Sequence, residues 1–407
     1  MKHARILAPL LCLTALAHAA TDWPQFRGPD GNGHSPAKNL PLNWDATNNV
    51  QWKTELPGKG WSSPVLHRDH IYLTTAEEAG ANLSLRVLCH SAASGQQQWS
   101  TEAIATPPVK HHAKNSQASP TVLADGNRLY VHFGHYGTAC LDLAGKVLWK
   151  QTELKYSPVH GNGGSPILVG NALIFSADGG SDPSVIALDK ASGKVLWKTK
   201  RETAAKRNFS FSTPTLITVK GQQQLITPGS GVVCALDPKT GAEFWRCRYG
   251  DGYSVIPKPV FGHGMIFIGT GYDKPTVLGI RADGKGDVTD THLVWKLEKG
   301  APHTPSPLLV GNELYIVSDA GIASCLDAKT GTVHWSERVP GNYSASPLLA
   351  EGKIYLQNET GTGVVLKPGR TFEKLAENAL GEKSLASYAV TDGALFIRTE
   401  KNLYRIG

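Results

Sequence analysis

The sequence predicts an all-β fold, an eight-bladed β-propeller of four-stranded antiparallel blades. Three observations support this. A unit recurs along the chain every 40 to 56 residues, as propeller blades do. The chain has 43 Gly and 25 Pro, with 41% hydrophobic and 18% charged residues, which excludes a disordered chain and favours short strands joined by turns. The two ends of the chain carry complementary parts of one blade.

Each unit opens with a small residue and a proline ahead of an apolar run. The starts are Ser63-Pro64, Ser119-Pro120, Ser165-Pro166, Thr213-Pro214, Lys258-Pro259, Ser306-Pro307 and Ser346-Pro347, and Ser387-Tyr388 opens an eighth unit without the proline. Proline is tolerated at the first residue of a strand, where its missing N–H breaks no ladder bond. We therefore expect an inner strand, A, after each start.

The rest of the unit supplies three more strands. In the third unit, strand A is expected at 167–169 and strand B at 172–176, after a Gly-Asn hairpin turn. Strand C ends in Leu-Asp, and a turn containing Gly leads to strand D, which carries a Trp. Glycine provides the positive φ of the turn, and the Trp provides apolar surface between blades. The structural Trp positions are Trp52, Trp99, Trp149, Trp197, Trp245, Trp295 and Trp335.

The chain ends predict how the ring closes. Residues 388–406 supply strands A to C with no Trp strand after them, and residues 49–53 form a Trp strand with nothing before it. Pairing them completes an eighth blade and removes the exposed edges of an open ring. Residues 21–407 are thus expected to form a single domain.

Residues 1–20 read as a signal peptide. A basic start with Lys2 and Arg5 precedes an apolar run over 6–17 and the small-x-small site Ala17-His18-Ala19. We expect cleavage near Ala19 or Ala20, and export to the periplasm or the extracellular space. No later stretch approaches the roughly 18 apolar residues of a membrane span.

The charge and the cysteines add three expectations. The formal charge of +7 falls to +5 when Lys2 and Arg5 are removed, and no dense basic stripe occurs, so no nucleic-acid partner is expected. We expect a monomer. Five cysteines follow residue 20, and Cys234 and Cys247, which lie across one hairpin, could form a disulfide.

The motifs resemble a known family. Ala187-Leu188-Asp189 followed by Gly193 and Trp197, and the same pattern from Ala235 to Trp245, are similar to the PQQ-like β-propeller repeat of quinoprotein alcohol dehydrogenases and of BamB. The opening residues 22–31, DWPQFRGPDG, resemble the start of exported members. The resemblance implies the propeller fold and makes PQQ a possible cofactor. The adjacent cysteines that quinoprotein enzymes of this kind carry have no counterpart here.

Candidate site residues come from the loops. The D–A and B–C loops of a propeller gather on one face around the channel, so repeat position tells which residues share that funnel. Aromatic faces stack a ring, and Arg and Lys pair with carboxylates, so the funnel suits a polar or anionic small molecule. The candidate ligand-binding residues are His111, His112, Lys114, His135, Tyr136, His160, Asn162, Arg207, Phe211, Tyr253, His303 and Tyr343. The B–C loops add Asp178, Tyr272, Asp319 and Glu359.

Two clusters invite a metal interpretation. His111, His112, His135 and His160 fall in neighbouring blades, and imidazoles bind transition metals or transfer protons. A metal or catalytic site, a metal-free ligand site and ordinary loop histidines all remain open interpretations. Residues 283–290 contain three Asp that could bind calcium, but we interpret them as a turn rich in Asp and Gly.

The sequence favours a binding or scaffold protein of the bacterial cell envelope. Its ligand, or another envelope protein, is expected on the funnel face. The alternative is an enzyme using the same funnel, either a PQQ-dependent oxidoreductase or a metal-dependent enzyme acting on sugars. Gly-x-Ser-x-Gly, HExxH and phosphate-loop motifs are absent from the sequence.

Overall fold

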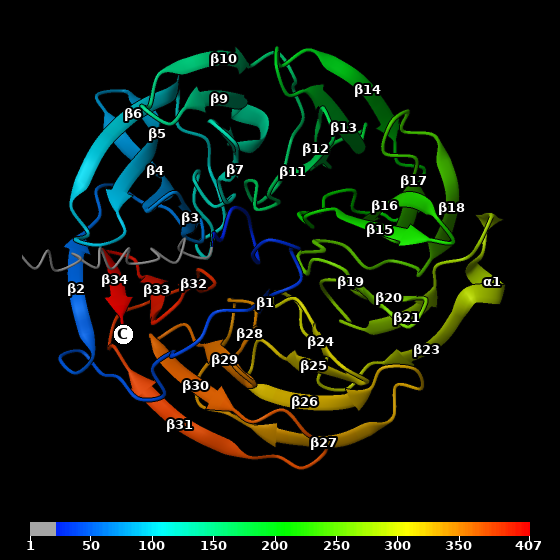
Figure 1. Cartoon of the computed structure of the whole chain (residues 1–407). Helices are drawn as coiled ribbons and strands as arrows, with labels where there is room; N and C mark the ends of the chain where they lie inside the picture. Colours follow the sequence, from blue (N-terminus) through cyan, green and yellow to red (C-terminus); the bar gives the residue numbers. More distant parts are fainter. Residues whose placement is uncertain (1–21) are drawn as a thin grey trace, which may run out of the picture.

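The computed structural model describes residues 22–407, so the predicted signal peptide lies outside the described residues. In residues 22–407 the strands form eight sheets around a central channel (Figure 1). Each sheet is a four-stranded antiparallel blade, and two sheets gain a fifth, parallel strand. The predicted eight-bladed propeller is confirmed.

Each blade runs from a short strand A beside the channel to strand D at the rim. Blade 1 contains β3 (Val65–His67), β4 (His70–Ala79), β5 (Asn82–Ser91) and β6 (Gln97–Thr106). Blade 2 contains β7 (Leu123–Asp125), β8 (Arg128–His132), β9 (Thr138–Asp142) and β10 (Val147–Gln151). Blade 3 contains β11 (Ile167–Val169), β12 (Ala172–Ala177), β13 (Ser184–Asp189) and β14 (Val195–Lys200). Blade 4 contains β15 (Thr215–Val219), β16 (Gln222–Gly229), β17 (Val232–Leu236) and β18 (Glu243–Arg248).

The other half of the ring repeats this order. Blade 5 contains β19 (Val260–Gly262), β20 (Met265–Gly269), β21 (Val277–Arg281) and β23 (Leu293–Leu297). Blade 6 contains β24 (Leu308–Val310), β25 (Glu313–Val317), β26 (Ile322–Asp327) and β27 (Val333–Arg338). Blade 7 contains β28 (Leu348–Ala350), β29 (Lys353–Gln357), β30 (Thr362–Leu366) and β31 (Lys374–Ala379). Blade 8 contains β32 (Ala389–Thr391), β33 (Ala394–Arg398), β34 (Asn402–Ile406) and β2 (Val50–Glu55).

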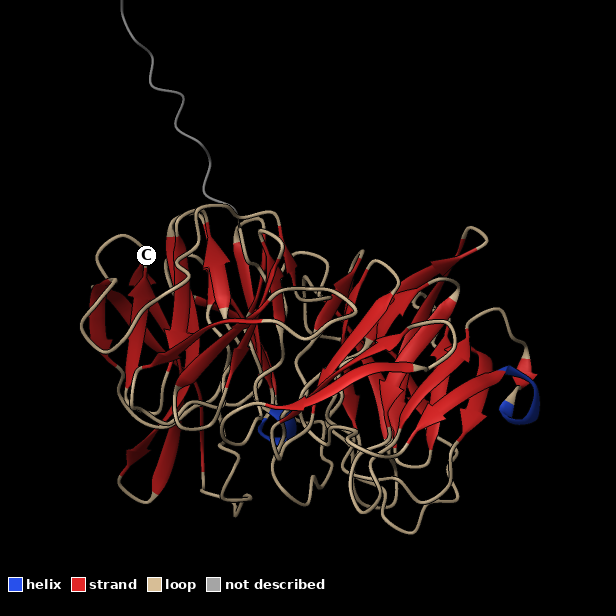
Figure 2. Ribbon diagram, turned by 90° about the horizontal axis from the view of Figure 1, so that it is seen from below, coloured by secondary structure: helices blue, strands red, loops and turns tan. Residues whose placement is uncertain are grey.

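Both chain ends build blade 8, as predicted. Its outer strand, β2, pairs antiparallel with β34, which places Trp52 opposite Arg405. Seen from the side, the longer loops and the short helix η1 (Gly134–Tyr136) project from one face of the ring (Figure 2). That face carries the D–A and B–C loops, so it is the funnel face.

The repeat Trp residues pack against the next blade. Trp197 of blade 3 donates from Nε1 to the carbonyl of Pro238 in blade 4, at 3.2 Å. A Cβ added to Gly241 of the same blade 4 turn would lie 2.6 Å from Cε3 of Trp197. The same contact joins Gly95 to Trp52, Gly145 to Trp99, Gly193 to Trp149 and Gly331 to Trp295. Glycine is therefore needed in this turn for space as well as for positive φ.

The Trp residues of blades 4 and 6 are exceptions. Trp335 of blade 6 packs on Phe372, 5.1 Å between ring centroids, and no Gly Cβ position in the described chain lies against its ring. The turn of blade 5 that would cover Trp245 is replaced by residues 283–292, which form β22 (Gly286–Asp287) and helix α1 (Thr289–His292). β22 pairs in parallel with β18, and Val288 packs in the same apolar cluster as Trp245.

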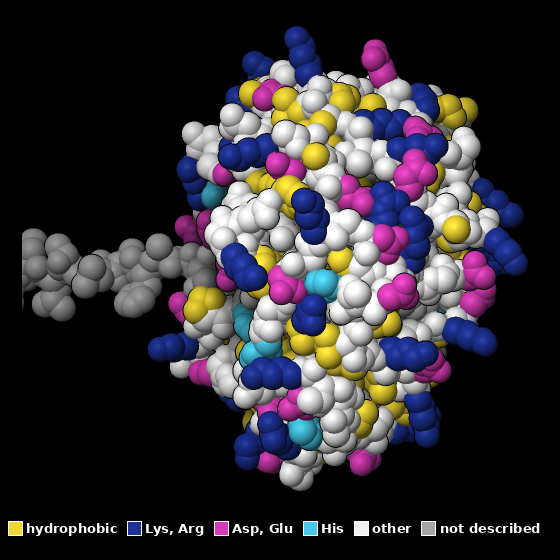
Figure 3. All heavy atoms as spheres, turned by 90° about the vertical axis from the view of Figure 1, so that its right-hand side faces the viewer, with side chains coloured by type: hydrophobic (Ala, Val, Ile, Leu, Met, Phe, Trp, Pro, Cys, Tyr) yellow, Lys and Arg dark blue, Asp and Glu magenta, His cyan; other side chains and the backbone are white. Residues whose placement is uncertain are grey.

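The sequence predicted a simple turn over residues 283–290, and this is wrong. These residues form a short strand and the beginning of a helix, and the strand extends the sheet of blade 4. On this outer side, cationic and anionic side chains are interspersed (Figure 3).

A ring of hydrogen bonds surrounds the channel. The residue two positions before strand A carries a hydroxyl in seven of the eight blades described, and the exception is Lys258. Backbone N–H groups donate to the hydroxyl of the next blade. The bonds run from Ser63 to Thr121, Thr121 to Ser165, Ser165 to Thr213, Lys258 to Ser306, Ser306 to Ser346, Ser346 to Ser387 and Ser387 to Ser63, at 2.9–3.2 Å. In blade 2 the ring residue is Thr121, so the predicted start at Ser119-Pro120 lies two residues too early.

Residues 23–33 cross the channel and plug it (dark blue in the centre of Figure 1). Trp23 exchanges two backbone hydrogen bonds with Leu66 in blade 1. The carbonyl of Gly33 accepts from the N–H of Leu349 in blade 7, and β1 (His34–Ser35) then runs parallel to β28. This plug ties blades 1 and 7, which flank blade 8, to each other.

Two further observations complete the fold. Cys89, Cys140, Cys234, Cys247 and Cys325 are buried and free, so the disulfide considered between Cys234 and Cys247 does not form. Cys247 lies opposite Val233 and Cys234 opposite Arg246, so neighbouring residues of the ladder separate the two thiols. No helix in the described part of the chain is long and apolar enough to cross a membrane.

The contact between Gly241 and Trp197 can be tested with a matched pair of substitutions. Gly241 and Gly264 have φ of +74° and +73°, but only Gly264 has open space where a Cβ would be. We expect both Gly→Ala changes to lose about 1 kcal/mol of unfolding free energy from backbone strain. Gly241→Ala is expected to lose roughly 1–3 kcal/mol more, because the Trp ring must move. Equal losses in urea denaturation would contradict the proposed contact.

Candidate functional site

The funnel leads into a closed cup on the axis of the ring. This cavity has a volume of about 960 Å³ and draws its lining from every blade. Its floor consists of Phe26 from the plug and of the ring hydroxyls of Ser63, Thr121, Ser165, Ser306, Ser346 and Ser387. The plug and the hydrogen-bonded ring together make the channel a cup.

An arc of aromatic side chains follows one side of the cup, from blade 2 to blade 6. Each ring contacts the next. The centroid distances are 5.3 Å for His112–His160, 5.1 Å for His160–Phe209, 5.3 Å for Phe209–Tyr253, 6.1 Å for Tyr253–Tyr272 and 4.8 Å for Tyr272–His303. The arc offers stacking surface to a planar group.

The positive charge of the cup sits beside this arc. The Cζ atom of Arg207 lies 4.5 Å from the ring centroid of Tyr253, and its Nη1 contacts the hydroxyl of that residue. No carboxylate in residues 22–407 lies within ion-pair distance of Arg207. Its charge is therefore available to a ligand.

Asp319, which lines the cup, and Glu359, which binds the lining residue Lys114, already have partners. Asp319 accepts from the backbone N–H of His303 and from Oγ1 of Thr304, both at 2.7 Å. Burial alone would raise the pKa of Asp319, but bonds from His303 and Thr304 outweigh it and lower that pKa. Glu359 accepts from Nζ of Lys114 at 2.8 Å, a bond that joins a loop before blade 2 to blade 7. A third carboxylate, Asp273, accepts from the Tyr253 hydroxyl that Arg207 contacts, but it forms no direct ion pair with Arg207.

The predicted site residues divide into two groups. His112, Lys114, His160, Arg207, Phe211, Tyr253 and His303 line the cup. His111, His135, Tyr136, Asn162 and Tyr343 do not. Tyr343 is fully buried between blades 6 and 7, and Asn162 is buried with its amide bonded to the carbonyl of Gly164. Tyr343 and Asn162 thus pack inside the protein and do not reach the cup.

The four histidines considered for a metal fall into separate places. His112 and His160 face each other at the cup, and burial followed by the proximity of His112 lowers the pKa of His160. The ring of His135 instead lies against the ring of Tyr136, with 4.0 Å between their centroids. Burial, and to a smaller extent the charge of Lys155, lowers the pKa of His135. His111 bonds to Gln117. Within the described residues, no group of three or more His, Cys, Asp and Glu side chains could hold a metal ion.

Several lining residues escaped the sequence reasoning. Phe26 belongs to a motif noted only as a resemblance, and nothing in its pattern indicated that it reaches the axis. Phe209 belongs by repeat position to the same D–A loop as Arg207 and Phe211, and it lines the cup with them. Most of the ring hydroxyls are the small residues that open the repeat units, such as Ser63 and Ser165. Their position in the repeat is visible in the sequence, but the pattern does not indicate that they face the axis.

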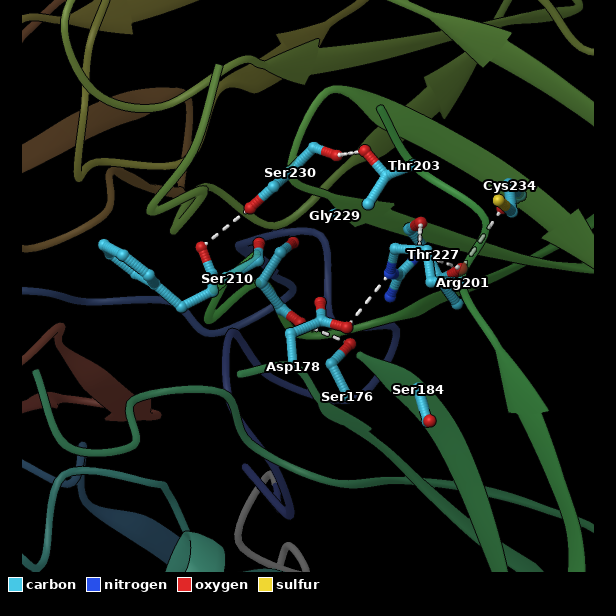
Figure 4. A network of polar contacts seen from close by, with 12 residues as sticks. Ser176, Asp178, Ser184, Arg201, Thr203, Ser210, Thr227, Gly229, Ser230 and Cys234 are labelled. Carbon is cyan, nitrogen blue, oxygen red and sulfur yellow. Dashed lines mark hydrogen bonds and ion pairs between the residues drawn. The ribbon is translucent and has the colours of Figure 1, made fainter. Parts of the chain in front are cut away.

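A buried ion pair positions the Phe209 loop (Figure 4). Asp178, from the end of β12, accepts from Nε of Arg201 at 3.0 Å, and both side chains are 1% exposed. Burial opposes the charge of Arg201, but Asp178 outweighs it and raises the pKa of Arg201. Arg201 also donates to the carbonyl of Thr227 in blade 4. Nearby, Ser230 donates to the carbonyl of Phe209 at 2.9 Å. Asp178 is thus a structural residue that joins blades 3 and 4.

A family model matches most of the chain. The model described as outer membrane protein assembly factor BamB matches residues 38–153, 84–251 and 231–371. Among curated proteins, a lanthanide-dependent methanol dehydrogenase from Methylorubrum extorquens is 32% identical over 161 residues, covering 35% of this chain and 24% of that protein. A tetrathionate hydrolase from Acidithiobacillus ferrooxidans is 22% identical over 315 residues, covering 64% and 58%. The chain thus spans less than two thirds of either relative.

Solved structures show the same fold at low identity. BamB from Moraxella catarrhalis superposes with a TM-score of 0.62 at 15% identity, covering 88% of this chain and 96% of that one. A quinohemoprotein alcohol dehydrogenase from Comamonas testosteroni superposes with a TM-score of 0.68 at 13% identity, covering 96% and 81%. Both likenesses concern the fold alone.

The residues of the cup do not fit a quinoprotein centre of the kind that the resemblance describes. The sequence has no adjacent cysteine pair. Asp319 and Glu359 are held by neighbouring donors, and no metal-ligand cluster occurs in residues 22–407. We therefore derive no chemistry through a quinone.

Removing Arg201 should destabilise the ring more than removing an exposed cation beside it. In Arg201→Met the buried carboxylate of Asp178 loses its partner, which we expect to cost about 3–5 kcal/mol in urea denaturation. Lys198→Met, which breaks an exposed pair with Asp182, should cost below about 1 kcal/mol. The double change Arg201→Met with Asp178→Leu should recover most of the loss. If it recovers none, the charge of Asp178 is not the cause.

Proposed function

Because this chain belongs to the family of the outer membrane protein assembly factor BamB, we propose that it is an exported binding protein of the bacterial cell envelope. Its ligand is a small anionic molecule with a planar group, held in the cup. The observation that carries this proposal is the continuous aromatic arc from His112 to His303 beside the unpaired guanidinium of Arg207. Export rests on the signal-peptide pattern of residues 1–20.

The chemistry of the cup supports an anion over a cation. Arg207 forms no direct ion pair in the described chain. Asp319 and Glu359 accept from other donors, and Asp273 reaches Arg207 only through the hydroxyl of Tyr253. A planar ligand would stack against the arc near Phe209 and Tyr253, whose rings contact each other, and its acidic group would reach Arg207. The ring hydroxyls on the floor accept and donate hydrogen bonds to polar substituents. Aromatic walls with a few polar groups are typical of small-molecule sites.

Another envelope protein is the second candidate occupant, and the family description favours it. A partner would present an acidic or aromatic side chain to the same mouth, where Tyr272 is 55% and Val159 55% exposed. Recovery of a protein in place of a small molecule with the purified chain would select this occupant. A quinone absorbance band or stoichiometric metal in the same preparation would replace the binding role with an oxidoreductase.

The cup can be tested with an aromatic sulfonate, 8-anilinonaphthalene-1-sulfonate, followed by fluorescence. We expect the wild type to bind one equivalent in the cup. Arg207→Gln should raise the dissociation constant about tenfold, because one charge-assisted contact of about 1.4 kcal/mol is lost. Arg68→Gln is the matched control, because Arg68 is also exposed but lies in the A–B turn of blade 1.

Phe209→Leu tests separately whether the aromatic arc contributes to binding. It should weaken binding of the same sulfonate while leaving Arg207 in place. If neither Arg207→Gln nor Phe209→Leu changes the dissociation constant relative to Arg68→Gln, the cup is not the binding site and the proposal fails.

A further inference from the structure

Four cationic side chains are buried in this ring: Arg27, Arg201, Lys258 and Arg398. Arg201 pairs with Asp178. Nη1 of Arg398 donates to three oxygens, two from Ser62 and one from Thr74. Arg27, Lys258 and Arg398 have no carboxylate within ion-pair distance in residues 22–407. Arg27 and Lys258 differ from Arg398 because they are two cations that lie next to each other.

Arg27 lies in the plug and is only 2% exposed. Its Nη2 donates to the carbonyls of Asn32 and Pro307, at 3.0 and 2.8 Å. Nε and Nη1 are buried without a hydrogen-bond partner in the described chain. Burial lowers the pKa of Arg27 to about 9, so it stays charged at neutral pH. Nε and Nη1 are therefore two buried donors that the described chain leaves without an acceptor.

Lys258 lies beside it. Its backbone N–H donates to Ser306, the neighbour of the Pro307 that binds Arg27. Lys258 is 3% exposed, and no hydrogen bond from its Nζ to the described chain is found. The amine packs against Gly31 of the plug, where a methyl group would overlap it. Burial, followed by the charge of Arg27, lowers the pKa of Lys258 to about 7.

The position of Lys258 makes the cluster unusual within its own repeat. Lys258 occupies the one ring position without a hydroxyl, so the N–H of Thr213 has no hydroxyl to donate to in blade 5. Gly31, which has no side chain, leaves room for the amine of Lys258. The other seven blades carry Ser or Thr at the position of Lys258. Burying two like charges without a counter-ion is strongly unfavourable. Lysine can lose its proton, but arginine cannot do so near neutral pH.

We propose that the plugged channel holds a small inorganic anion of halide size between Arg27 and Lys258. The anion accepts from Nε and Nη1 of Arg27 and from Nζ of Lys258, which are the donors that the chain itself leaves unused. This site lies beneath the plug residue Phe26 and is separate from the cup above it. The proposal does not depend on the proposed function of the cup. The acidic side chain of the plug, Asp30, is exposed and forms no ion pair with either cation.

The test compares thermal unfolding of the mature chain in sodium chloride, sodium bromide and sodium gluconate at one ionic strength. Halide bound to the native state should raise the melting temperature of the wild type in a saturable way, by about a few degrees relative to gluconate. Lys258→Ser should abolish the halide response. This variant is expected to fold, because Ser restores the hydroxyl found in most other blades. Lys299→Ser, at an exposed lysine of the same blade, should keep the response.

Crystals grown in sodium bromide locate the anion directly. An anomalous peak within hydrogen-bond distance of both Arg27 and Lys258 is expected in the wild type and not in Lys258→Ser. Equal halide responses in the wild type and Lys258→Ser would overturn the proposal, as would no halide response in the wild type. Peaks at surface lysines and arginines alone would indicate an adventitious ion only, and would also overturn it.

Discussion

A propeller of independent blades keeps its shape only if neighbouring blades are held at a fixed distance from the axis. In this chain the ring of hydroxyls sets that distance, because seven of the eight blade starts donate one backbone hydrogen bond to the side chain of the next. Closure depends on the last link, from Ser387 to Ser63, which joins residues 324 positions apart. At the rim, a Trp of one blade and a Gly turn of the next make the corresponding outer contact. Most blades are therefore held at both their inner and their outer ends.

The repeat explains why so much of the fold could be predicted. Strand positions, the Trp strand at residues 50–55 and the composite eighth blade follow from patterns that recur and that local chemistry explains. Errors arose where a unit departs from the pattern. In blade 2 the proline does not follow the ring residue. Pro120 precedes Thr121, whose hydroxyl belongs to the ring, so the proline pattern places the start of this blade two residues too early. Residues 283–292 pair with the adjacent blade, which a pattern within one unit cannot reveal.

The candidate site was less predictable for a physical reason. Repeat position fixes which face a loop joins, but it does not fix the direction of each side chain, because D–A loops differ in length and carry little regular hydrogen bonding. Tyr253 and His303 point into the cup, whereas Tyr343, at a comparable place, is buried between blades. The plug was hidden for a different reason. Phe26 reaches the axis only because residues before and after it are tied to blades 1 and 7, which are far apart in the sequence.

Stability of the ring favours eight equivalent blades, whereas binding of a ligand in one orientation requires blades that differ. Eight equivalent blades would surround the axis with eight equivalent loops, and such a cup could not orient a ligand. Orientation comes from the departures: aromatic rings gather on the loops of blades 2 to 6, Arg207 stands beside them, and Lys114 reaches blade 7 across the mouth. Beneath them, Lys258 gives up a link of the ring and places an amine beside Arg27. The hydroxyls and Trp–Gly contacts of the other blades provide the stability that allows these departures. In a repeat protein of this kind, the residues that break the pattern are therefore the first candidates for function.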